Sequence, residues 1–127
     1  MKYLLDTHVA IWALEDETKL SKTAKLIMKD TSISLCVSVV SVWEIAIKSS
    51  IGKSSFSGGS SFFLEKMRQN GVEILELKDF HISDVEGLPF HHRDPFDRIL
   101  ISIAIAENLT LLTADENIQK YNALWTW

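Results

Sequence analysis

The chain has 127 residues and a formal net charge of −4, and 46% of its residues are hydrophobic. We expect one globular domain, residues 1–127, because this length buries a sufficient core without disulfides, and the single cysteine, Cys36, excludes an internal one. The acidic balance disfavours a protein that binds nucleic acid over a broad surface. It does not exclude a nuclease, since carboxylates that bind a metal count as negative in the sum.

Membrane association and secretion are not expected from this sequence. Among its apolar runs, none reaches the roughly 20 residues that a membrane-spanning helix needs. Met1 and Lys2 are followed by a short apolar run and Asp6, without the longer apolar segment of a signal peptide. Together with a lone cysteine in an apolar run, this predicts a cytoplasmic protein.

Apolar, β-branched runs alternate with segments of helical periodicity. From the N-terminus we expect a strand at residues 2–6, helices at 9–14 and 21–30, a strand at 33–37, a helix at 39–50 and a Gly- and Ser-rich loop at 53–61. There follow a helix at 62–70, a strand at 72–77, helices at 79–86 and 95–108, a strand at 110–113, a helix at 114–121 and a last strand at 124–127. This alternation predicts an α/β fold in which a mostly parallel central sheet lies between two layers of helices.

Acidic residues lie within or directly beside the apolar runs at four places: Asp6, Glu44, Asp97 and Asp115. A carboxylate held against an apolar core must be paired, protonated or bound to a cation. The same runs do not contain an equal number of basic residues. Ligands of parallel sheets bind beyond the carboxyl ends of the strands, where Asp6, Glu44 and Asp115 are expected. We therefore expect the four acids to converge on a shared divalent metal.

Local structural roles explain some of these acids equally well. Asp6 begins an Asp-Thr-His sequence that suits a turn, and Lys48 is spaced to pair with Glu44 on a helix surface. However, the helix around Glu44 is largely apolar, which leaves little surface for an ordinary ion pair. For Asp6 both interpretations stay open, and for Glu44 we favour a functional role.

The two later acids lie beside predicted helix starts. Asp94 suits the N-cap of the helix that begins at the following proline, and Asp97 occupies its third position, where an acid favours the helix dipole. Capping accounts fully for Asp94, while for Asp97 the structural and functional interpretations are balanced. We expect Thr113 to cap the last helix with Glu116 completing a capping box, which leaves Asp115 free for another role.

A set of carboxylate ligands suits Mg²⁺ or Mn²⁺ better than zinc, which prefers nitrogen and sulfur. Such an ion activates water and stabilises the attacking and leaving oxygens of a phosphodiester. The predicted reaction is therefore metal-dependent hydrolysis of phosphodiester bonds without a covalent enzyme intermediate.

The chain resembles the PIN-domain family, and within it the VapC-type toxins of VapBC toxin–antitoxin modules. The resemblance spans essentially the whole chain and rests on residues 4–8, 41–48, 92–98 and 112–115. It implies a PIN-like three-layer α/β/α sandwich, Mg²⁺- or Mn²⁺-dependent endoribonuclease activity, homodimers, and inhibition by a small cognate VapB-type antitoxin. The acidic quartet of the family carries over to Asp6, Glu44, Asp97 and Asp115.

The resemblance also implies roles for neighbouring polar residues. Thr7 and Thr113 match small polar positions beside the metal site, whereas His8 stands where many relatives have Asn or Ser. Apart from the resemblance, the basic residues nearest the acids are candidates to hold RNA phosphates or the transition-state charge: His91, His92, Arg93 and Arg98. Asp94 is a further supporting candidate. The alternative is a polar loop in which Arg98 pairs with a carboxylate.

Two other functions are compatible with the same fold. A catalytically silent PIN-like binding module would have no need for a complete acidic quartet, which this chain retains. A phosphatase with Asp6 as nucleophile would want a second acid two residues later, where this chain has His8. The metal-dependent ribonuclease is therefore the leading hypothesis.

Overall fold

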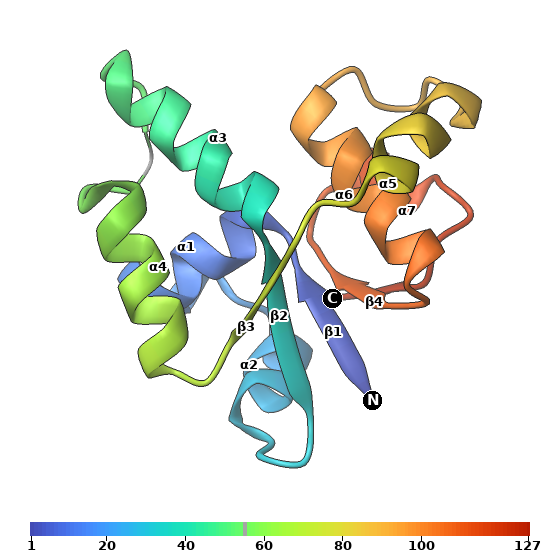
Figure 1. Cartoon of the computed structure of the whole chain (residues 1–127). Coiled ribbons are helices and arrows are strands. Elements are labelled where there is room, and N and C mark those ends of the chain that lie inside the picture. The colour runs from blue at the N-terminus through green and yellow to red at the C-terminus, as the bar shows by residue number, and fades with distance from the viewer. Residues whose placement is uncertain (55) are drawn as a thin grey trace.

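The computed structural model describes residues 1–54 and 56–127, which contain one wholly parallel, five-stranded sheet. Across the sheet the strand order is β3-β2-β1-β4-β5 (Figure 1). The strands are β1 (Lys2–Leu5), β2 (Ser34–Ser38), β3 (Glu73–Leu75), β4 (Thr110–Leu112) and β5 (Trp125–Thr126). The order changes direction between β1 and β4, which is the switch point where open parallel sheets bind ligands.

Helices connect the strands and cover both faces of the sheet. They are α1 (Thr7–Glu15), α2 (Lys22–Lys29), α3 (Val39–Ser50), α4 (Gly59–Gln69), α5 (Asp79–Asp84), α6 (Pro95–Ala106) and α7 (Glu116–Gln119). Short 3₁₀ helices occupy Glu17–Lys19 and Val85–Gly87. In the part of the chain that the structure describes, every helix is too short or too polar to cross a membrane.

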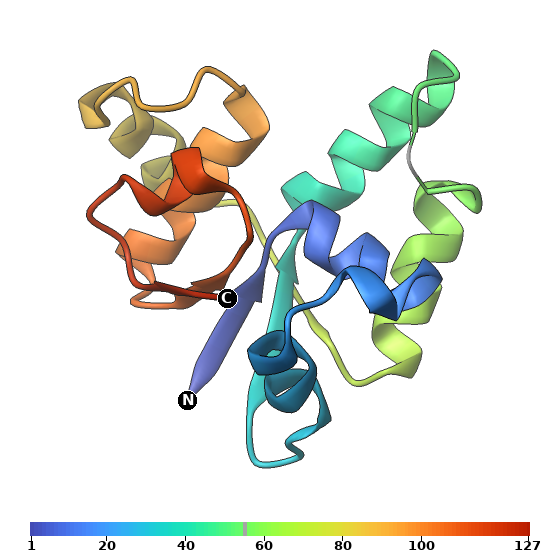
Figure 2. The same ribbon diagram turned by 180° about the vertical axis from the view of Figure 1, so that it is seen from behind.

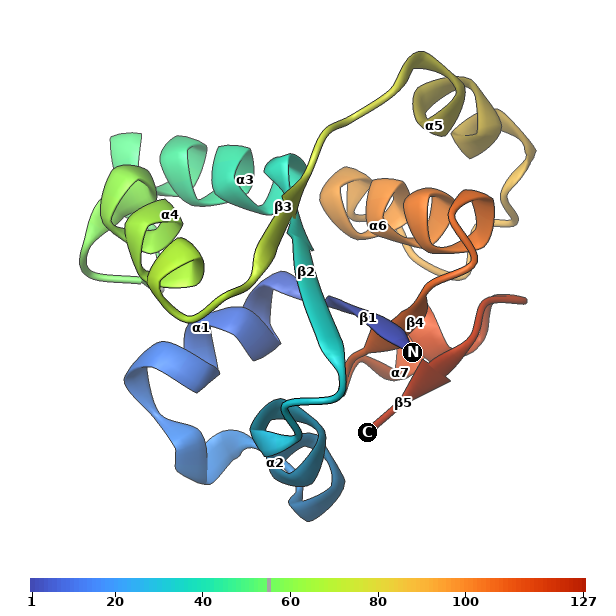
Figure 3. The same cartoon turned by 60° about the horizontal axis from the view of Figure 1, so that its bottom comes forward.

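The two faces of the sheet belong to two separate cores. Neighbouring residues of a strand face opposite sides, so Leu4 packs with the buried residues of α6 while Leu5 packs with those of α1 and α4. Leu4 is in register with Leu111, and Leu5 with Leu112, so adjacent strands repeat this division. The result is the predicted three-layer α/β/α sandwich, with helices on both sides of the sheet (Figure 3).

Helix ends follow local rules at several places. The Ser21 hydroxyl accepts a hydrogen bond from the Ala24 amide at 3.0 Å and caps α2. Asp94 Oδ1 accepts from the amides of Phe96 and Asp97 at 2.8 and 3.2 Å and caps α6. After α4, Gly71 takes a φ of +73°, a left-handed conformation that glycine adopts without steric cost.

Several predicted boundaries were wrong. The first helix begins at Thr7 rather than at residue 9, directly after Asp6. The helix predicted from residue 62 begins at Gly59. The rings of Phe62 and Phe63 pack on Phe56 just before the helix, and this contact outweighs the low helix propensity of the Gly-Ser segment. The loop predicted at 53–61 is correspondingly shorter, and its residue 55 lies outside the described residues.

The later elements are also shorter than predicted. The helix expected at 79–86 ends at Asp84 and continues as the 3₁₀ turn Val85–Gly87. The helix expected at 95–108 ends at Ala106, and Asn108 takes a positive φ of 53° that turns the chain into β4. The helix expected at 114–121 is confined to Glu116–Gln119.

The N-cap of α6 gives a first testable prediction. We expect Asp94→Ala to lower the free energy of unfolding by about 1 kcal/mol, because the amides of Phe96 and Asp97 lose their acceptor. Asp94→Asn removes the same charge but keeps a capping oxygen, so it serves as the matched control. Urea denaturation of the two variants measures the difference, and equal stabilities would contradict the capping role.

Candidate metal centre

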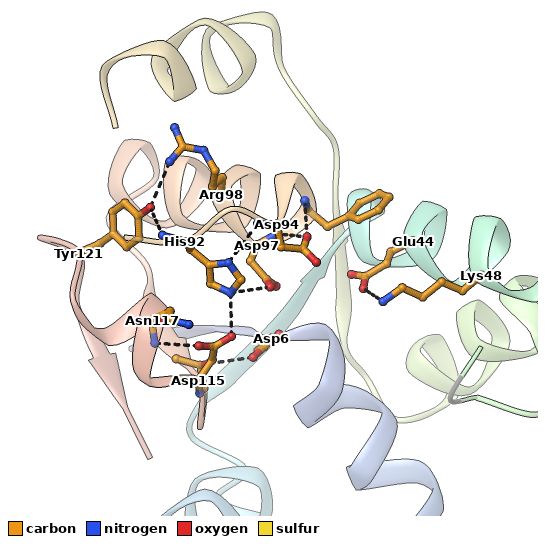
Figure 4. A network of polar contacts seen from close by, with 12 residues as sticks. Asp6, Glu44, Lys48, His92, Asp94, Asp97, Arg98, Asp115, Asn117 and Tyr121 are labelled. Atoms are coloured by element: carbon orange, nitrogen blue, oxygen red, sulfur yellow. Dashed lines mark hydrogen bonds and ion pairs between the residues drawn. The ribbon is translucent and has the colours of Figure 1, made fainter. Parts of the chain in front are cut away.

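The four candidate acids lie at the carboxyl edge of the sheet, near the switch point. Asp6 directly follows β1, and Asp115 follows β4 at the start of α7. Glu44 lies in α3, which begins immediately after β2, and Asp97 lies in the first turn of α6. Views from opposite sides place α3 and α6 on either side of the carboxyl end of β1 (Figures 1 and 2), and their acidic side chains face the same space (Figure 4).

Electrostatic coupling between the acids agrees with this convergence. Burial raises the pKa of Asp97 to about 8, with further contributions from the charges of Asp6, Asp94, Glu44 and Asp115. Burial also raises the pKa of Asp6, against the opposing effect of a hydrogen bond from Thr113. The charges of Asp115 and Glu44 act on Asp6 in the same upward direction. The fold therefore concentrates carboxylates that repel one another in a poorly solvated space.

Threonine hydroxyls support the first acid and the adjacent helices. Thr113 Oγ1 donates a hydrogen bond of 2.8 Å to Asp6 Oδ2 and accepts one of 3.1 Å from the Asp115 amide. It thereby links two members of the quartet. The hydroxyls of Thr7 and Ser41 are 2.7 Å apart and fully enclosed, and this hydrogen bond ties the start of α1 to α3.

Glu44 combines the ion pair expected from local rules with a buried, unpaired oxygen. Its Oε2 accepts from Lys48 Nζ at 2.6 Å, and this hydrogen bond is the largest cause that raises the pKa of Lys48. The Glu44 side chain is only 4% exposed. Among the described residues, no partner satisfies Glu44 Oε1 or Asp6 Oδ1, although both atoms are buried. Unsatisfied buried oxygens are costly, and both are hard donors that suit a divalent cation.

Asp115 has a different local role from the one predicted. Its Oδ1 accepts from the Asn117 amide at 2.8 Å, so Asp115 rather than Thr113 caps α7. The prediction was wrong because the Thr113 hydroxyl is directed to Asp6, which lies far away in the sequence. Burial acts to raise the pKa of Asp115, but the hydrogen bonds from His92 and Asn117 outweigh it, and the pKa is lowered.

His92 lies inside the acidic cluster rather than at its margin. Its Nε2 is 2.9 Å from Asp115 Oδ2 and 3.1 Å from Asp97 Oδ2. One ligand atom from each of these three residues lies within 4.8 Å of the other two, so the group could hold a metal ion. Figure 4 shows the imidazole between the two carboxylates.

The two arginines differ in their surroundings. Arg98 is 5% exposed, and its guanidinium donates to the Pro89 carbonyl at 2.8 Å and the Tyr121 hydroxyl at 3.1 Å. It also lies over the ring of Phe90, 4.1 Å from the ring centroid. The hydrogen bonds of Arg98 thus go to the preceding loop and to Tyr121, not to the acids. Arg93 is exposed in that loop.

Sequence reasoning did not single out Ser41 or Tyr121 as parts of this region. Ser41 precedes Glu44 by three residues, so both lie on one helix face, and this spacing could have identified it. Tyr121 has no comparable local signal. It joins the site only because the folded chain places its hydroxyl beside His92 and Arg98.

A family model that describes the PIN domain matches residues 3–124 of the sequence. The chain belongs to the PIN-domain family. The resemblance noted in the sequence is therefore confirmed over nearly its whole length, and the four candidate acids of this PIN domain lie at the carboxyl edge of the sheet. A comparison with curated proteins gave no significant match.

Solved structures share the fold of this PIN domain at low sequence identity. One match is a chain of VapBC2 from Rickettsia felis, a complex bound to a DNA fragment from its promoter. The TM-score is 0.71 and the identity 19%, over 99% of this chain and 98% of that chain. DNA-bound VapBC from Salmonella typhimurium matches with a TM-score of 0.68 and 16% identity, over 98% of this chain and 96% of that chain. PAE2754 from Pyrobaculum aerophilum matches with a TM-score of 0.59 and 18% identity, over 98% of this chain and 83% of that chain. These likenesses show a common fold.

The raised pKa of Asp97 predicts an unusual pH dependence for the stability of the metal-free PIN domain. Burial in the folded chain raises the pKa of Asp97 from its ordinary value of 3.8 to about 8. Between these values the folded state binds more protons, so its stability falls as the pH rises. We expect the wild type to lose stability relative to Asp97→Asn across this range, by up to about 1.4 kcal/mol per pH unit. Urea denaturation at a series of pH values in EDTA measures this difference.

Asp84→Asn is the matched control for this experiment. Asp84 is exposed at the end of α5, away from the acidic cluster. Its variant should therefore follow the pH profile of the wild type. If the profile of Asp97→Asn also ran parallel to that of the wild type, the electrostatic account of the cluster would be wrong.

Proposed function

We propose that this PIN domain is a Mg²⁺- or Mn²⁺-dependent endoribonuclease that acts as the toxin of a toxin–antitoxin module. The observation that carries the proposal is the pair of buried carboxylate oxygens, Asp6 Oδ1 and Glu44 Oε1, that have no partner among the described residues. The side chains of Asp6 and Glu44 lie around the same space as those of Asp97 and Asp115 (Figure 4). A cation bound in this space would offset both the burial and the repulsion between carboxylates that raise the pKa of Asp97.

The chain's own residues would hold the ion and the substrate. The quartet supplies the oxygen ligands, and hydrogen bonds from Thr113 to Asp6 and from Lys48 to Glu44 orient two of them. When bound, the ion supplies Lewis-acid chemistry that activates water and stabilises negative charge on the scissile phosphodiester. The exposed Arg93 is the candidate to contact RNA phosphates beside the acids.

A VapB-type antitoxin and a second copy of the chain are the proposed protein partners. The similar structures include a toxin–antitoxin complex from Klebsiella pneumoniae and VapBC complexes from other bacteria. Large apolar side chains are well exposed on this chain, for example Trp43 at 57% and Ile82 at 54%. Exposed apolar groups of this kind favour protein–protein contact. The proposed location of such a module is the cytoplasm.

Cleavage of RNA by the purified protein tests the proposed function. We expect total RNA to be cut with Mg²⁺ or Mn²⁺ and left intact with EDTA. Glu44→Gln should lower the rate about 100-fold or more, because a catalytic ion supplies several kcal/mol of transition-state stabilisation. Glu86→Gln, the same change at an exposed position, is the control and should cleave like the wild type.

Other outcomes would select the alternative functions. Calorimetry with Mn²⁺ should show binding to the wild type and weaker binding to Glu44→Gln. Intact RNA together with no heat of Mn²⁺ binding would favour a silent PIN-like binding module. A covalent phosphate trapped on Asp6 would favour the aspartate-nucleophile phosphatase instead.

A further inference from the structure

The position of His92 suggests a role that its sequence neighbourhood does not reveal. Its ring lies between two acids of the candidate metal centre, with Nε2 2.9 Å from Asp115 Oδ2 and 3.1 Å from Asp97 Oδ2 (Figure 4). An imidazole in such a place could ligate the ion itself or donate a hydrogen bond to the carboxylates that do. The contacts of the opposite ring nitrogen distinguish these two roles.

The other ring nitrogen fixes the position of the proton. Nδ1 of His92 lies 3.1 Å from the backbone nitrogen of Asp94, which donates its N–H. A nitrogen that accepts a hydrogen bond carries a lone pair, so the proton of the neutral ring is on Nε2. The Nε2–H bond therefore points at the two carboxylates.

This tautomer is incompatible with ligation through Nε2. A metal bond would need the Nε2 lone pair, and the ring proton would then move to Nδ1. There it would face the N–H of Asp94, and two donors that face each other repel. The Asp94 amide cannot turn away easily, because Asp94 also caps α6 through its side chain. The geometry thus selects a hydrogen-bond donor and disfavours a ligand.

A buried frame holds the ring in this place. The His92 amide donates to the Tyr121 hydroxyl at 3.0 Å, and Arg98 donates to the same hydroxyl at 3.1 Å. Arg98 also binds the carbonyls of Val85 and Leu88, at 3.2 and 3.3 Å, so the loop before α6 is tied to both α6 and Tyr121. Arg98 and Tyr121 are each only 5% exposed.

We propose that His92 is a positioning residue, whose Nε2–H holds the Asp97 and Asp115 carboxylates in the orientation that receives the ion, and that it is not itself a ligand. This inference rests on the proposed metal-dependent function. A carboxylate oxygen has two lone pairs, so Oδ2 of either residue can accept the His92 hydrogen bond and still face a cation. Residues that orient metal ligands in this way contribute to metal affinity without touching the metal.

Spectroscopy of the histidine ring nitrogens tests the tautomer directly. The chain has four histidines, and the signals of His92 are those that disappear in His92→Gln. In mildly alkaline buffer, ¹⁵N–¹H ring correlations should show a protonated Nε2, and this pattern should persist when Mg²⁺ is added to saturation. Loss of the Nε2 proton on addition of Mg²⁺ would identify a ligand and overturn the proposal.

Two substitutions separate the donor from the rest of the side chain. The amide nitrogen of glutamine reaches the position of Nε2, while that of asparagine reaches only the position of Nδ1. Calorimetry should therefore show Mg²⁺ binding that is about 10- to 100-fold weaker in His92→Asn and largely restored in His92→Gln. Glu65→Gln, a change at an exposed position of α4 outside the frame around His92, should leave the Mg²⁺ affinity unchanged. Thermal melting in EDTA verifies that each variant is folded.

The outcomes distinguish this inference from the proposed function. If His92→Asn binds Mg²⁺ as tightly as the wild type, or more tightly, the positioning role is wrong even when the wild type cleaves RNA. If the wild type binds Mg²⁺ but leaves RNA intact, the nuclease proposal fails and the variants still decide the role of His92. If the wild type binds no Mg²⁺, both proposals are overturned.

Discussion

The crowding of carboxylates at one edge of the sheet is the constraint on which the rest of this structure depends. Asp6, Glu44 and Asp97 are each at most 8% exposed, so water cannot screen their mutual repulsion. The protein offsets part of this cost with a hydrogen bond or ion pair from another residue to each of the four acids. Asp6 and Glu44 still retain buried oxygens without a described partner. Such an arrangement disfavours the metal-free state and favours the binding of a cation.

Several side chains serve the fold and the candidate site together. Asp115 caps α7 with one oxygen and accepts from His92 with the other. The Asp94 side chain caps the N-terminus of α6, while the Asp94 amide donates to His92 Nδ1 and orients the ring. The positive ends of these helix dipoles also favour the acids placed there. Because of this sharing, a substitution in the cluster changes both stability and site geometry, and only matched variants can separate the two effects.

Much of the fold could be predicted because it depends on local patterns. The apolar runs and their alternation with helical segments indicated a parallel sheet between helices, and α3 was predicted with its correct bounds. Errors arose where a contact from outside the helix decides its end, as at Gly59, where the ring of Phe56 packs on that of Phe62 at the start of α4. In the same way, Thr113 and Asp115 were both suitable caps by local rules, and the hydrogen bond from Thr113 to Asp6 decided between them.

The sequence by itself determined which acids are candidates and that the strands present three of them at one edge, because strand ends and helix starts are properties of short segments. It also determined the PIN-domain resemblance, which four short motifs carry. Only the tertiary structure decided that His92 lies between Asp97 and Asp115 and that Arg98 is directed to the loop and Tyr121. These contacts join residues whose separation in the chain carries no periodic signal, so packing alone sets them.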